Sequence, residues 1–149
     1  RGFCSIYVSK YMMNREIGFG RRLLQIFEEE GLSFEHMPSG IDNISVIVPE
    51  SAFTATVAAH ILGRISRELD ADDVSVERGL TLVMVVGEGM SHTVGLAGRA
   101  CRAFARAAVN LEMINQGSSE VSMMFGIKDD DMTAAVRALY EEFFAAVPA

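Results

Sequence analysis

Two neighbouring stretches of the sequence decide the fold: Phe3-Cys-Ser-Ile-Tyr-Val-Ser-Lys10 and, after a short loop, Gly18-Phe-Gly-Arg-Arg-Leu-Leu-Gln-Ile-Phe-Glu-Glu-Glu30. The first stretch alternates apolar and polar residues, which predicts a strand. The second carries apolar residues at helical spacing, and Gly31 supplies a stop signal after it. We therefore expect a strand, a loop and a helix in this order.

The same reading extends along the rest of the chain. It predicts, in order, strands over 32–37 and 44–48, a helix over 54–69 and a strand over 74–77. This is the βαββαβ order of a ferredoxin-like unit, with two helices on one face of an antiparallel sheet. The order then begins again, with a strand over 81–86, a helix over 94–108, strands over 110–114 and 121–127, and a helix over 132–144.

A shift of 77 residues supports an internal repeat. It aligns six identical pairs in the same structural order: Met13 with Met90, Gly18 with Gly95, Phe27 with Phe104, Glu35 with Glu112, Gly40 with Gly117 and Ser45 with Ser122. We predict an α+β protein of two tandem ferredoxin-like domains, 1–79 and 80–149. The second domain lacks its last strand, which we expect to come from residues upstream of Arg1 in a longer protein, or from another chain.

Composition narrows the function. The chain has 149 residues, 13 basic and 20 acidic side chains and a net charge of −7, which disfavours nucleic acid as the main partner. No apolar run is long enough to span a bilayer, and no signal peptide opens the chain, so we expect a cytoplasmic protein. Cys4 and Cys101 do not have a metal-binding or redox spacing, and we interpret both as buried thiols.

Catalytic and metal-binding patterns are absent from the sequence. His36, His60 and His92 fall in separate elements without the spacing of metal ligands. No phosphate-binding loop, dinucleotide fingerprint or nucleophile elbow is present. We therefore predict no catalytic residue, no metal site and no cofactor in this chain.

The junction between the first strand and the first helix, present in both repeats, is the candidate ligand site. A helix that begins at glycine exposes free backbone N–H groups, which suit a carboxylate. Glu16 and Glu35 are acceptors for a cationic group of the same ligand. In the alternative interpretation, Gly18 and Gly20 only allow close helix packing and both glutamates are solvated.

Three motifs resemble the C-terminal regulatory region of aspartate kinases, which consists of tandem ACT domains. They are 11–21, 35–42 and above all Val109-Asn-Leu-Glu-Met-Ile-Asn-Gln-Gly-Ser-Ser-Glu-Val-Ser122. The resemblance covers essentially the whole chain. It implies that the chain lacks the kinase domain, and with it the ATP and Mg²⁺ sites, and is inactive alone.

The resemblance also implies a role in regulation. Aspartate kinases phosphorylate the aspartate side chain on the way to lysine, threonine and methionine, and end products inhibit them through the ACT domains. Carried over by position, the effector-binding residues are Met13, Glu16, Gly18, Phe19, Gly20, Ser33, Phe34, Glu35, Ser39, Asn110 and Leu111.

Charge predicts the effector. A pocket flanked by two glutamates favours lysine, with threonine as the alternative, alone or together with lysine. The family further implies a homodimer through the ACT domains and the kinase domain of the same protein as a partner. The competing hypothesis is a structural dimerisation domain, or a small subunit of the kinase, that binds no ligand.

Overall fold

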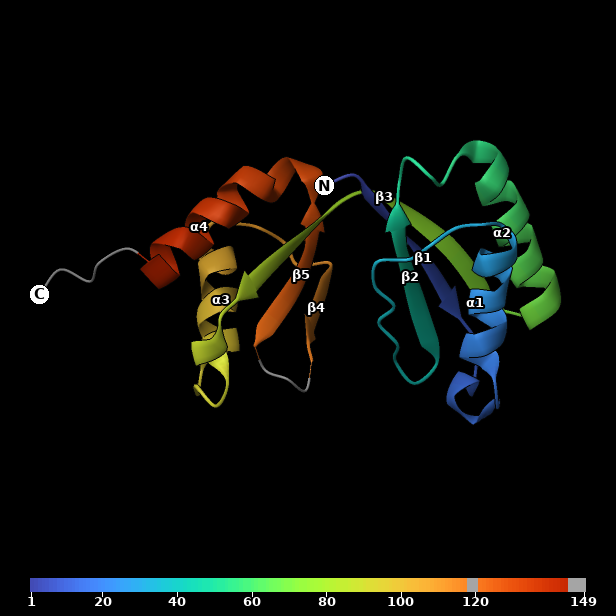
Figure 1. Cartoon of the computed structure of the whole chain (residues 1–149), viewed down its shortest axis with the longest axis horizontal. Coiled ribbons are helices and arrows are strands. Elements are labelled where there is room, and N and C mark those ends of the chain that lie inside the picture. The colour runs from blue at the N-terminus through green and yellow to red at the C-terminus, as the bar shows by residue number, and fades with distance from the viewer. Residues whose placement is uncertain (118–120, 145–149) are drawn as a thin grey trace, which may run out of the picture. The chain divides into compact units, whose positions relative to one another are not determined.

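The computed structural model describes residues 1–117 and 121–144, which divide into two compact units. One unit comprises Gly2–Gly79, and the other comprises Leu80–Ala149 together with Arg1. Each unit is α+β, with antiparallel strands and two helices on one side of them (Figure 1).

The first unit contains strands β1 (Phe3–Ser9) and β2 (Asn43–Pro49) and the first part of β3 (Asp73–Val86), with β1 in the middle. Helices α1 (Phe19–Glu29) and α2 (Ala55–Leu69) cover these strands, and a 3-10 turn, η1 (Met13–Arg15), lies between β1 and α1. Alternation explains the packing, because every second residue of β1, namely Cys4, Ile6 and Val8, is buried in the core beneath the helices. Leu23, Ile26 and Phe27 of α1 meet them there.

The second unit repeats this plan. The later part of β3 pairs with β5 (Ser122–Lys128), which pairs with β4 (Met113–Gln116). Helices α3 (Leu96–Arg106) and α4 (Met132–Phe144) pack over them, and 3-10 turns η2 (Glu88–Met90) and η3 (Asp129–Asp131) precede α3 and α4. The rings of Phe104 and Phe125, 4.9 Å apart, form the centre of this core.

Two predicted strands differ from the structure. Residues 32–37 form no regular strand: His36 and Ser39 make isolated antiparallel bridges to β2, and Pro38 has no N–H to donate. The strand predicted over 110–114 is β4, three residues later at its start, because the N–H of Val109 still bonds Phe104 of α3. The predicted strands over 74–77 and 81–86 are one continuous strand, β3.

Helices α1 and α3 begin one and two residues later than predicted. Gly18 and Gly95 are the N-cap residues of α1 and α3, with φ of 80° and 88°, so neither belongs to the helix that it precedes. This left-handed conformation is accessible to glycine and strained for other residues, which explains the glycine at both positions.

Candidate functional site

The junction between β1 and α1 is a tight loop held by its own backbone. The N–H of Met13 donates to Lys10 (3.0 Å) and that of Glu16 donates to Met13 (3.1 Å). The N–H of Asn14 donates to Ile41 (3.2 Å), which brings the 39–42 loop against this junction. The loop that contains the predicted residue Ser39 therefore contacts the 3-10 turn η1 through Ile41.

The first turn of α1 has the properties of a carboxylate site. Its first turn carries no acidic side chain and Gly18 makes no side-chain cap, so the amides of Gly20 and Arg21 have no intrahelical acceptor. The positive end of the helix dipole lies at the same place. A free amino acid could bind these amides through its carboxylate.

Two predicted contact residues are part of the core instead of the surface. The side chains of Met13 and Phe19 are 7% and 3% exposed and pack in the first hydrophobic cluster. Their side chains are therefore not available to contact a ligand on the surface.

Glu16 is already engaged by two cations. Its Oε2 lies 3.2 Å from the ammonium of Lys10, and its Oε1 accepts a hydrogen bond from Arg22. The Lys10 hydrogen bond, followed by that of Arg22, holds the pKa of the Glu16 carboxyl below its ordinary value. Glu16 is therefore ionised at neutral pH, and its charge is balanced before any ligand arrives.

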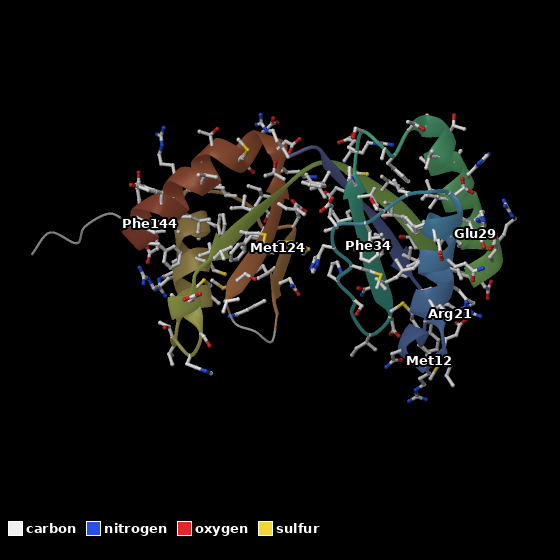
Figure 2. All side chains as sticks on the ribbon, in the orientation of Figure 1. Met12, Arg21, Glu29, Phe34, Met124 and Phe144 are labelled. Carbon is white, nitrogen blue, oxygen red and sulfur yellow. The ribbon has the colours of Figure 1, made fainter. Side chains whose placement is uncertain are left out.

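Ser33 and Phe34 lie at the other end of α1. With Leu24 and Phe27 they line a cavity of about 470 Å³ beside the C-terminal half of the helix. A rise of about 1.5 Å per residue makes the helix roughly 16 Å long, so these two residues are far from its first turn. Figure 2 shows Phe34 on the strand side of this unit and Arg21 on α1.

Glu35 directly follows Phe34 along the chain and precedes the loop that contains Ser39. Its N–H donates to Ile47 of β2 (2.8 Å), and its side chain is exposed. Its position is therefore fixed by the sheet edge, while its carboxylate stays accessible.

Asn110 and Leu111 precede β4 in the second unit, and so the prediction that they occupy a strand is wrong. The Asn110 side chain is exposed and donates to Glu112 (2.9 Å). Leu111 is half-buried against the second core cluster.

Of the predicted buried thiols, Cys4 is fully buried, with its pKa raised by burial to about 11, whereas Cys101 is only partly buried.

The second unit contains a matching junction before α3. The N–H of Met90 donates to Gly87 (3.0 Å), that of Thr93 donates to Met90 (3.1 Å), and Gly95 caps α3. Thr93 occupies the place of Glu16, and its hydroxyl donates to the carbonyl of Gly89. The two junctions therefore share these backbone bonds and differ at this position, where one has a carboxylate and the other a hydroxyl.

Sequence reasoning missed Lys10 and Arg22, the two cations beside Glu16. A usable signal was the rarity of lysine, since Lys10 and Lys128 are the only two lysines in the chain.

Within the described part of the chain, no three His, Cys, Asp or Glu side chains could hold a metal ion. Across residues 1–117 and 121–144, no helix is long and apolar enough to cross a membrane.

Comparison with known proteins assigns the family. An ACT domain family model matches residues 83–143. The chain is 59% identical to aspartokinase 3 of Bacillus subtilis over 146 residues, which is 98% of this chain and 32% of that protein. The chain belongs to the regulatory regions of the aspartate kinase family.

Solved structures agree with this assignment. The aspartate kinase of Clostridium acetobutylicum, described as an allosteric enzyme, superposes with a TM-score of 0.90 at 35% identity, over 95% of this chain and 32% of that one. The regulatory subunit of aspartate kinase from Thermus flavus has the same fold, with a TM-score of 0.81 at 21% identity over 95% of this chain and 93% of that one. This aspartate kinase regulatory region thus spans about a third of the Bacillus relative.

Proposed function

We propose that this chain senses an end-product amino acid, lysine first, and transmits its presence to an aspartate kinase domain as feedback inhibition. The observation that carries the proposal is the β1–α1 junction. It combines helix amides that have no intrahelical acceptor, suited to a carboxylate, with the ionised Glu16, suited to a cationic group. The exposed Glu35, beside Ile47 of β2, is a separate acidic residue that the same proposal tests. Inhibition then requires tighter binding to the inactive arrangement of the kinase than to the active one.

The proposed assembly is a cytoplasmic homodimer paired through its ACT domains, with the kinase domain of the same protein as partner. ATP and Mg²⁺ belong to that kinase domain in this proposal, and the regulatory region itself needs no cofactor. Threonine is the alternative effector, since a hydroxyl needs only a neutral hydrogen-bond partner.

We propose two ACT domains, 1–79 and 80–149, the second completed by a strand from upstream of residue 1. Val83–Val86 of β3 and apolar residues of α4, including Leu139 and Tyr140, line an apolar groove of about 350 Å³. Arg1 groups with this second unit, which supports a preceding segment that reaches the same unit. A longer chain should protect the amides of 80–86 from hydrogen exchange, and unchanged exchange would contradict this arrangement.

The test of function is isothermal titration of the chain with lysine and, separately, with threonine, with the mass in solution recorded in each state. Saturable lysine binding to a dimer is the expected result. Glu35→Ala should lower lysine affinity at least about tenfold, or ~1.4 kcal/mol, while threonine affinity changes less. Equal lysine affinity of the variant and the parent chain removes Glu35 from the site.

A ligand-free dimerisation domain is the second candidate. One observation favours it: Lys10 and Arg22 already neutralise Glu16, so no charge at that carboxylate awaits a ligand. A stable dimer that binds neither amino acid would select this function.

A further inference from the structure

Lys10 joins three parts of the first unit through one ammonium group. It follows β1, and its Nζ donates to the carbonyl of Leu69 at 2.7 Å. The same Nζ lies 3.2 Å from Glu16 Oε2 and 3.8 Å from Asp70 Oδ2. The side chain is only 18% exposed, so its position is set by these acceptors.

Two of these acceptors, Leu69 and Asp70, lie at the end of α2 and in the α2–β3 turn, residues 70–72. Leu69 is the last residue of α2, where carbonyl groups have no intrahelical donor, and a cation there also complements the helix dipole. Backbone contacts join the same two segments: the N–H of Tyr11 donates to Asp72 Oδ2 (2.6 Å), and the N–H of Asp72 donates to Ser9 (2.9 Å). The β1–α1 junction and the α2–β3 turn are therefore joined to each other by hydrogen bonds.

Lys10 places an ammonium group beside Glu16, and a free lysine carries the same group on its side chain. Arg22 occupies Oε1 of the same carboxylate, and Lys10 occupies the Oε2 side. A ligand ammonium directed to Glu16 therefore meets the ammonium of Lys10 at the same oxygen. Two like charges at one carboxylate oxygen repel each other, so binding there favours departure of Lys10.

We propose that Lys10 is an internal occupant of the cation position beside Glu16, which a ligand with a side-chain ammonium displaces, loosening the α2–β3 turn. This inference rests on the proposed function and names its regulatory device. Once Lys10 leaves Glu16, its bond to Leu69 loses the second acceptor that fixes it. The turn 70–72 leads directly into Asp73, the first residue of β3.

The experiment combines titration with residue-resolved hydrogen exchange on the 149-residue chain. Lys10→Met removes the internal ammonium, and Arg67→Met, an exposed change on α2, is the control of equal charge. Without ligand, Lys10→Met should speed exchange of the Tyr11 and Asp72 amides at least about threefold, and the control should not. Lysine should produce the same acceleration in the parent chain, whereas norleucine, which lacks the ammonium, should not.

Affinity gives the second readout. Lys10→Met should bind lysine about fivefold more tightly than the parent chain, the scale of one partly exposed ion pair, and norleucine equally. Should Lys10→Met not fold, Glu16→Gln replaces it: this variant should lose the preference for lysine over norleucine.

The outcomes separate this inference from the proposed function. Equal lysine affinity of the parent and Lys10→Met chains overturns the displacement and leaves the proposed function intact. Lysine binding by Lys10→Met alone supports Lys10 as the occupant. If neither chain binds lysine, lysine sensing and displacement fail together, and unchanged Tyr11 and Asp72 exchange in ligand-free Lys10→Met refutes the fastening role independently.

Discussion

Gly18 and Gly20 provide a matched pair of positions that differ in backbone conformation. A Cβ added at either one meets no atom within 4 Å, so alanine clashes with nothing at both. Gly18, however, has φ of 80°, while Gly20 lies within α1. Alanine at each position therefore changes the free energy of unfolding through backbone conformation alone.

The expected effects have opposite signs. The left-handed conformation costs an L-residue roughly 1–2 kcal/mol, so Gly18→Ala should lower the free energy of unfolding by about that amount. Gly20→Ala should raise it by about 0.5–1 kcal/mol, because glycine loses more conformational entropy in a helix than alanine.

Urea denaturation followed by circular dichroism measures both variants against the parent chain. Gly18→Asn serves as the control, since asparagine tolerates the left-handed conformation and should recover part of the loss. Equal shifts of the same sign for the two alanine variants would refute the conformational argument.

Three further predictions follow from single residues. Ala108, two residues after the end of α3, has φ of 55°, and the first unit has Gly31 at the matching position, so Ala108→Gly should raise the free energy of unfolding by about 0.5–1 kcal/mol in urea. Burial lowers the pKa of His36 below its ordinary value of 6.5, so its stabilising contribution is complete above that pH and is lost as the pH falls below it. The urea midpoint should therefore fall more between pH 7 and 5.5 in the parent chain than in His36→Gln, and parallel pH profiles would contradict this. The native chain should react with iodoacetamide at Cys101 and not at Cys4, because Cys4 is fully buried with its pKa raised to about 11, and mass spectrometry of labelled peptides checks the order.

Local pattern predicted most of the elements. The helix over 132–144 has the bounds of α4, and Thr54 caps α2 by accepting from the N–H of Val57, as a helix over 54–69 requires. These elements are set by periodicity and caps within one segment. The strand predicted over 32–37 failed because its pairing depends on β2, and Pro38 interrupts the ladder there.

The candidate site was less accessible to sequence reasoning. Glycine at the start of a helix is a local signal, and Gly18 is indeed the N-cap of α1. The ion pairs of Glu16 are not local, because Lys10 is positioned by Leu69, 59 residues away along the chain. Burial of Met13 beneath the loop likewise depends on packing between elements rather than on spacing.

The two junction loops have one consequence for the diversification of such regulators. Matching backbone bonds of 3.0 Å, from the N–H of Arg22 to Gly18 and from the N–H of Arg99 to Gly95, begin the helix after each loop although the residues of the two loops differ. The residues before these glycines, Ile17 and Val94, are 98% and 99% exposed, so neither is needed for the core. A duplicated loop of this kind can exchange its lining without rebuilding its frame, and ligand preference in one copy can change while the other copy keeps its own.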